Sequence, residues 1–80
     1  MPQPPVYPIP DDAPKARTIW RHFKGNQYHV IGVGYHSETG QTMVAYSLYG
    51  GDGTIYFRPL HSWQDWIPDM RCLRFTEVDT

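Results

Sequence analysis

The chain is short and almost neutral. It has 80 residues and a formal net charge of −1, which is the size of one domain that buries about 60–65% of its unfolded surface. Near-neutrality gives no overall attraction to nucleic acid or to anionic membranes. The single cysteine, Cys72, excludes an intrachain disulfide and fits a reducing cytoplasm. We expect no export and no membrane insertion, because no signal peptide and no apolar run of about 20 residues is present.

Proline dominates the first sixteen residues. Six of the eight prolines fall within residues 1–14, where fixed φ angles and missing N–H groups favour extended polyproline II. We therefore predict a Pro-rich tail over 1–16 and a folded domain over 17–80. The tail is either a linker or a docking ligand, since Pro2, Pro5 and Pro8 have PxxP spacing. As a ligand it would dock within one chain or across a weak homodimer.

From Thr18 onward, short apolar and aromatic runs alternate with turn residues, which is typical of strands. The first predicted strand is residues 18–23, and the Gly25-Asn26 turn leads into a second strand, residues 27–35. These two strands should pair. Gly32 and Gly34 lie inside the second strand, where glycine permits a bulge or a sharp bend.

The second half of the domain predicts two more strands, a helical turn and a closing strand. The third strand is residues 42–49, and a glycine-rich turn at residues 50–53 leads to the fourth, residues 54–58. Ser62 offers an N-cap, with Asp65 three residues on, for a short helical turn that carries Trp63 and Trp66 and ends at Pro68. The last strand runs from about residue 73 to 78.

This order of elements indicates the fold class. A meander of short strands, a one-turn helix and a closing strand predict a mainly β fold, a small SH3-like antiparallel β-barrel of about five strands with one short helical turn before the last strand. An OB-like barrel is the alternative. That fold needs longer strands and a full helix between the third and fourth strands, for which the chain has no room.

Several short motifs follow one another through the domain. In chain order they are WRHFKGN, YHV, GV, HSET, LYG and FRPL. In this order the chain resembles the family catalogued as domain of unknown function 1653, whose pattern contains HFKG, HSET, LYG, RPL and a terminal RF. The resemblance covers residues 20–75 and implies a small bacterial domain of this architecture. It implies no activity, so function has to be argued from the residues.

Histidines and a serine raise the question of a metal or catalytic site. His22, His29 and His36 recur at even spacing with Glu38 nearby, but paired ligand motifs such as HExxH or CxxC are absent. Ser37 has no nucleophile elbow, and side chains adjacent in sequence are poorly placed to act on one another. We predict no metal, no cofactor and no catalytic residue. The HSET segment is explained by a polar hairpin loop in which the Ser37 or Thr39 hydroxyl and the Glu38 carboxylate accept hydrogen bonds from backbone N–H groups.

Arg58 is the most informative single charge. It lies between Phe57 and Pro59 at the end of an aromatic strand, where a half-buried guanidinium needs a carboxylate or several carbonyls around it. Glu38 and Asp52 lie in loops that could reach it. Arg58 is then either a clamp that ties loops to the barrel or an anchor for a carboxylate or phosphate of a partner.

The aromatic content favours a binding module. A core this small cannot hide twelve Phe, Trp and Tyr side chains, so we predict a non-catalytic module whose partner is a peptide, a protein or a small polar ligand. The candidate ligand-binding residues are Arg58, His36, Glu38, Tyr49, Tyr28, Tyr56 and Trp20.

Two other functions are open. A module for single-stranded nucleic acid is the first alternative, because small β-barrels bind single strands with a basic groove and stacking rings. The cations that would serve it are Lys15, Arg17, Arg21 and Lys24, interleaved with aromatic residues. A small enzyme is the second alternative.

Overall fold

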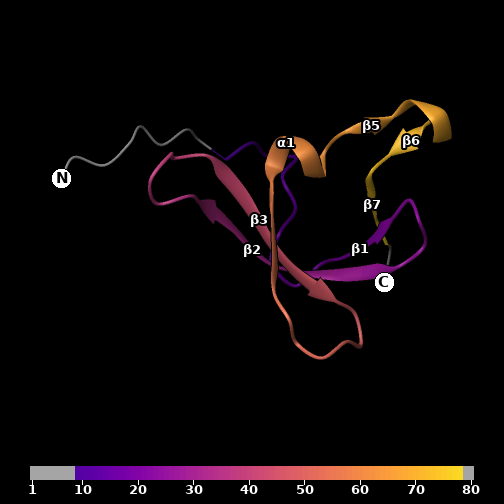
Figure 1. Ribbon diagram of the computed structural model, residues 1–80, viewed down its shortest axis with the longest axis horizontal. Coiled ribbons are helices and arrows are strands. Elements are labelled where there is room, and N and C mark those ends of the chain that lie inside the picture. The colour runs from indigo at the N-terminus through magenta and orange to yellow at the C-terminus, as the bar shows by residue number, and fades with distance from the viewer. Residues whose placement is uncertain (1–8, 79–80) are drawn as a thin grey trace.

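The computed structural model describes residues 9–78, and strands dominate it (Figure 1). Two short helices, α1 and the 3₁₀ helix η1, interrupt the second half of the chain. The elements are β1 (Ile19–His22), β2 (Gln27–Tyr35), β3 (Thr42–Leu48), β4 (Tyr56–Pro59), α1 (Leu60–Trp63), β5 (Trp66–Ile67), η1 (Pro68–Met70), β6 (Cys72–Leu73) and β7 (Phe75–Glu77).

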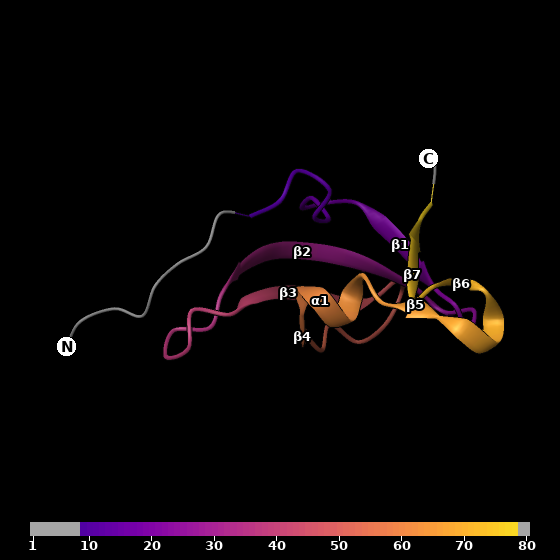
Figure 2. The ribbon, with the colours of Figure 1, turned by 90° about the horizontal axis from the view of Figure 1, so that it is seen from above.

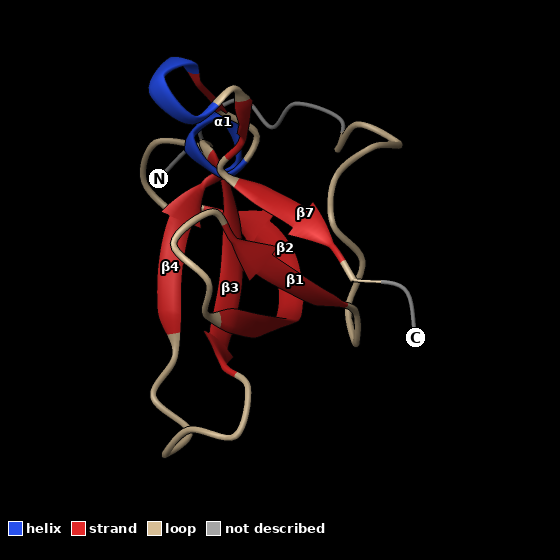
Figure 3. Ribbon diagram, turned by 90° about the vertical axis from the view of Figure 1, so that its right-hand side faces the viewer, coloured by secondary structure: helices blue, strands red, loops and turns tan. Residues whose placement is uncertain are grey.

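Five of the strands form one antiparallel sheet in the order β4-β3-β2-β1-β7 (Figure 3). The predicted pairing of the first two strands is confirmed, with Trp20 opposite Tyr28. The mainly β, antiparallel character is also confirmed. A closed barrel is not found, since within residues 9–78 the edge strands β4 and β7 do not pair with each other. β4 pairs only with β3 and β7 only with β1, so the described sheet keeps two open edges.

The bend predicted in the second strand is present as a β-bulge. Val30 pairs with Tyr46 and Gly32 pairs with Ala45, so Ile31 is an extra residue between two regular pairs. A bulge bends a strand and increases its twist. Figure 2 shows the resulting curvature of β2 and β3.

The core lies on one face of the curved sheet, here called the inner face. Side chains alternate across a strand, so Val44 and Tyr46 of β3 point inward and are buried, whereas Met43 and Ala45 point to the opposite, outer face. The buried core residues are Ala13, Val30, Val44, Tyr46, Leu60, Trp63 and Phe75.

Aromatic rings supply most of the volume of this core. Trp63 of α1 stacks on Phe75 of β7, with ring centroids 3.7 Å apart and planes 5° apart. Tyr46 meets the Trp63 ring edge-on at 5.0 Å, and Trp20 meets it at 5.8 Å. The short helix is therefore held to the sheet by a single large side chain with three aromatic neighbours.

The start of the helical turn differs from the prediction. Ser62 is not the N-cap, because α1 begins at Leu60 and Pro59 occupies the cap position without a side-chain hydrogen bond. Proline fixes φ near −65°, and Pro59 has φ −57°. The chain therefore enters the helix directly from β4, and the Ser62 hydroxyl inside the helix accepts a hydrogen bond from Arg58 instead.

A small hairpin that the sequence did not predict follows α1. Trp66 lies in β5 rather than in the helix, and β5 pairs with β6. The connection passes through η1, which begins with Pro68, and through Arg71, whose φ of 52° is left-handed. Pro68 therefore starts a 3₁₀ turn rather than ending the earlier helix.

Part of the Pro-rich segment contacts the domain. Ala13 is 4% exposed and belongs to the core, and Pro14 is also buried. The backbone N–H of Arg17 donates to the Val30 carbonyl at 2.9 Å, which joins the end of the segment to β2. The proposed boundary at residue 17 stays a prediction. The PxxP prolines at positions 2, 5 and 8 lie outside the described residues.

Candidate functional site

A shallow apolar groove of about 560 Å³ runs along the outer face of β2, β3 and β4. We call it the outer groove. None of its lining residues is Asp, Glu, Lys or Arg. They are Ile31, Gly32, Val33, Gly34, Tyr35, His36, Met43, Ala45 and Phe57.

Strand register explains the shape of the outer groove. Gly32 lies opposite Ala45, and Gly34 lies opposite Met43, so the floor is made of small or flexible residues. Its sides are higher. The bulged Ile31 is 45% exposed, and Phe57, which pairs with Ala45 from the other side, is 67% exposed. Two large apolar side chains thus border a strip of nearly bare backbone.

Neither steric crowding nor a positive φ requires glycine at these two positions. A Cβ atom added at Gly32 or at Gly34 would meet no other atom within 4 Å, and neither residue has a positive φ. Both are therefore replaceable as far as the described residues are concerned. Sequence reasoning noticed the pair and assigned it only to bending of the strand. It missed Phe57, Ile31 and Met43 as lining residues.

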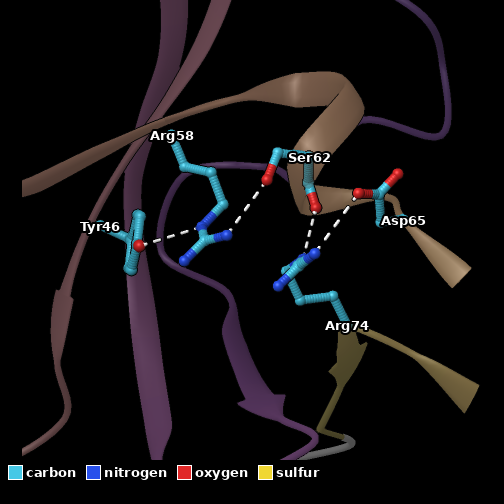
Figure 4. A network of polar contacts seen from close by, with 5 residues as sticks. All are labelled: Tyr46, Arg58, Ser62, Asp65 and Arg74. Carbon is cyan, nitrogen blue, oxygen red and sulfur yellow. Dashed lines mark hydrogen bonds and ion pairs between the residues drawn. The ribbon is translucent and has the colours of Figure 1, made fainter. Parts of the chain in front are cut away.

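Arg58 lies on the inner face, half-buried, where it contacts the aromatic core. Its Nε donates to the Tyr46 hydroxyl at 3.2 Å, and its Nη1 donates to Ser62 Oγ at 3.1 Å. The guanidinium carbon lies 5.6 Å from the centre of the Phe75 ring, a distance suited to a cation–π contact. The first two contacts tie β4 to β3 and α1 (Figure 4).

The two carboxylates expected beside Arg58, those of Glu38 and Asp52, do not contact it. Within residues 9–78, the only ion pair joins Arg74 Nη2 to Asp65 Oδ2 at 3.4 Å, so neither Glu38 nor Asp52 reaches Arg58. Asp52 instead accepts a hydrogen bond from the Thr54 N–H at 3.0 Å. Hydrogen bonding from Thr54 lowers the pKa of the Asp52 carboxyl. The carboxylate is satisfied within its own turn, which explains why it is not available to the arginine.

The loop that contains His36 is organised by its own side chains. His36 Nδ1 accepts hydrogen bonds from the backbone N–H groups of Glu38 and Thr39 at 3.1 and 3.2 Å. Thr39 Oγ1 accepts one from Gln41 at 3.2 Å. The loop is polar and self-satisfied, as predicted, although His36 supplies the acceptor expected from Ser37 or Glu38. His36 also lines one end of the outer groove.

Three of the four predicted aromatic candidates surround two neighbouring core rings: Tyr28 and Tyr56 contact Tyr46, and Trp20 contacts Trp63. Tyr28 is half-buried, with its ring 5.3 Å from Tyr46, and Trp20 is half-buried against Trp63. Tyr56 is exposed, and Tyr49 is 58% exposed beside the glycine-rich turn. None of these four candidates lines the outer groove. The rings of Tyr49 and Tyr56 are exposed outside the outer groove, where they are available for aromatic contacts with a ligand.

The predicted nucleic-acid residues are distributed over three structural environments. Lys15 lies in the N-terminal segment and donates to the Asp11 carbonyl at 3.2 Å, and Arg17 follows it with φ 69°. Arg21 is an exposed residue of β1, between inward-facing neighbours. Lys24 lies in the next turn, 5.8 Å from the centre of the Phe23 ring. None of these four cations lines the outer groove.

Among residues 9–78, no three His, Cys, Asp or Glu side chains lie close enough together to hold a metal ion. No helix in the same range is long and apolar enough to cross a membrane.

The family of the chain follows from its sequence. Residues 18–77 match the family described as "Protein of unknown function (DUF1653)". This match covers well over half of the chain, so the protein belongs to that family, and the predicted resemblance is confirmed. No curated protein and no solved structure matches the chain.

Proposed function

We propose that this DUF1653 protein is a non-catalytic binding module that takes up an apolar segment of a peptide or protein in the outer groove. One observation carries the proposal: Gly32 and Gly34 leave open space between two exposed apolar side chains, Ile31 and Phe57. Exposed, concave apolar patches are typical of interaction sites.

The energetic cost of the glycines supports this function. Glycine inside a strand costs about 0.5–1 kcal/mol relative to alanine, because it loses more backbone entropy on folding. At Gly32 and Gly34 no left-handed φ and no crowded neighbour offsets this cost. Strand glycines of this kind mark places where a ligand or another chain approaches the backbone closely. A partner that fills the open strip would explain why glycine occupies both positions.

The chemistry of the lining narrows the choice among the predicted partners. A small polar ligand needs convergent donors, acceptors or charges, and the outer groove contains no Asp, Glu, Lys or Arg. Its exposed Phe57 ring and the aliphatic Ile31 and Met43 suit apolar side chains such as those of Leu, Pro or Phe. A peptide or protein segment is therefore the favoured partner.

A display selection followed by matched variants tests the proposal. Peptides selected from a random library on the full chain should be rich in apolar residues. Gly34→Val fills the groove, and Phe57→Ser removes its side wall, so either change should weaken binding of a selected peptide about tenfold or more, equivalent to about 1.4 kcal/mol. Tyr49→Ser is the control, because Tyr49 is equally exposed but outside the groove. Equal binding by wild type, Gly34→Val and Phe57→Ser would refute the proposal.

The finer fold assignment is part of the same proposal. We propose that the sheet is an SH3-like barrel left open on one side. The strand order supports it, since β7 returns beside β1 and a 3₁₀ turn, η1, precedes the closing strands. Nuclear Overhauser contacts between β4 and β7 amides in solution would indicate closure, and their absence would leave an open sheet.

The other predicted properties have separate supports and tests. A cytoplasmic, bacterial setting is proposed from the lone, half-buried Cys72 and from the sequence resemblance.

Salt-sensitive binding of labelled single-stranded RNA would favour the nucleic-acid alternative over a peptide module. A weak homodimer would appear as concentration-dependent sedimentation. Docking of the Pro-rich tail would shift the amide resonances of the outer groove when residues 1–8 are deleted.

A further inference from the structure

Two arginine side chains meet at one serine on the inner side of the molecule, on the face opposite the outer groove. Arg58 Nη1 donates to Ser62 Oγ at 3.1 Å, and Arg74 Nε donates to the Ser62 carbonyl at 2.9 Å. Arg58 comes from β4 and Arg74 lies just before β7, so the helical turn α1 holds together two cations from distant parts of the chain. Figure 4 shows both guanidinium groups turned toward this turn. We call Arg58, Ser62 and Arg74 the arginine corner.

Positive charge in the arginine corner is only partly balanced. The one carboxylate nearby, Asp65, is half-exposed and makes a single 3.4 Å contact with Arg74. Within residues 9–78, no carboxylate lies within 4 Å of Arg58. Half-buried guanidinium groups are normally paired. Among the described residues, Arg74 has one weakly placed carboxylate and Arg58 has none, in a chain whose net charge is −1.

Hydrogen-bonding capacity is also left over. A guanidinium has five N–H donors in a planar fork. Arg58 donates to the Tyr46 and Ser62 hydroxyls, and Arg74 donates to the Ser62 carbonyl and to Asp65. Each arginine thus uses part of its fork to fix its position. The remaining donors are pre-positioned, which lowers the entropy cost of binding another acceptor.

A histidine side chain borders the arginine corner. His22 of β1 packs edge-on against the Phe75 ring at 4.9 Å, and that ring also lies beneath Arg58. Burial lowers the pKa of His22, and the charges of Arg58, Arg74 and Lys24 lower it further. The charges of Arg58 and Arg74 therefore reach the His22 ring.

We propose that the arginine corner binds a phosphate group, held by the guanidinium forks of Arg58 and Arg74. Two arginines suit a phosphate because parallel N–H donors match its oxygens and because its charge at neutral pH approaches −2. A monoanionic carboxylate would neutralise only one of the two cations. The inference does not rest on the proposed groove function, since Arg58 lies on the inner face.

The experiment is a nuclear magnetic resonance titration of the full chain. Inorganic phosphate, phosphoserine and acetate are added separately at constant ionic strength, with chloride as the screening control. Phosphate and phosphoserine should produce saturable shifts of the Arg58 and Arg74 side-chain Nε–Hε signals and of the His22 ring. Acetate should bind about tenfold more weakly. Equal shifts with chloride, or equal affinity for acetate, would overturn the proposal.

Variants of the arginine corner distinguish a phosphate-binding site from a purely structural contact between β4, α1 and the segment before β7. Arg58→Lys keeps the charge but loses the planar fork, so phosphate affinity should fall about tenfold while the sheet resonances stay in place. Arg71→Lys is the matched control, because Arg71 is an exposed arginine in the turn between η1 and β6, outside the corner. If Arg58→Lys unfolds the chain, Ser62→Ala, which removes only the hydroxyl, replaces it. Unchanged affinity in the folded variant would refute the site.

Discussion

Trp63 offers a quantitative test of how the core is built. The side chain is 1% exposed, and its indole Nε1 has no hydrogen-bond acceptor among the described residues. Trp63→Ala should cost about 3–5 kcal/mol, as large aromatic truncations do. A domain of 80 residues has a total stability of about 4–12 kcal/mol, so this variant should lose a large share of it and unfold at a much lower urea concentration than wild type.

Trp63→Phe should behave differently because it removes the unpaired N–H. The smaller ring loses about 1–2 kcal/mol of burial and packing, while removing a buried, unsatisfied donor recovers about 1–3 kcal/mol. The free energy of unfolding should therefore stay within about 1 kcal/mol of wild type, measured by urea denaturation followed by circular dichroism. A loss for Trp63→Phe as large as that for Trp63→Ala would show that the indole N–H is satisfied in solution.

Two further predictions concern pH and the turns. The lowered pKa of His22 means that the unfolded chain takes up its proton near the ordinary value of 6.5 and the folded chain only at lower pH, so thermal stability should fall as the pH is lowered through about 6.5. His22→Gln should reduce that loss, and an unchanged pH profile would contradict the assignment. Gly51→Ala should cost about 1 kcal/mol or more, because its Cβ would lie 2.9 Å from Leu48 Cβ. In the control, Gly34→Ala, no neighbour lies within 4 Å, so thermal melts should show no loss.

Strands bounded by strong turn signals were predictable from the sequence. The bounds of β2 agree with the prediction, because Gly25 before it adopts φ 114° and the HSET loop after it ends at Gly40 with φ 76°. The turn between β3 and β4 contains Gly50 and Gly53, both with positive φ. At these positions local backbone chemistry decides the conformation, so sequence alone is informative.

The elements after β4 were less predictable because tertiary contacts determine them. Arg71 adopts a left-handed φ of 52° without being glycine or asparagine, so the β5–β6 hairpin carries no recognisable turn signal. The helix starts earlier than the Ser62 cap would place it, since Trp63 is held by stacking on Phe75. Packing between residues far apart in sequence overrides local preference here.

The candidate sites were visible only in part. Gly32 and Gly34 were conspicuous, but recognising a groove requires the register that places Phe57 beside Ala45. Arg58 was identified from its aromatic surroundings, whereas Arg74 was not, because only the return of β7 to β1 brings the two arginines to Ser62. Sequence patterns identify unusual residues, and strand pairing decides which of them act together.

Phe57 and Arg58 provide the sharpest separation of the two proposed sites. They are adjacent on β4, yet alternation places Phe57 on the outer face and Arg58 on the inner face, where it contacts Tyr46 and Ser62. Phe57→Ser should weaken peptide binding and leave phosphate affinity unchanged, and Arg58→Lys should do the reverse. In the double variant, the two losses of binding free energy should add within about 0.3–0.5 kcal/mol, because the side chains share no partner. Titrations of all four proteins with a selected peptide and with phosphate measure this, and loss of both affinities in either single variant would mean that the strand, rather than two separate sites, had been disturbed.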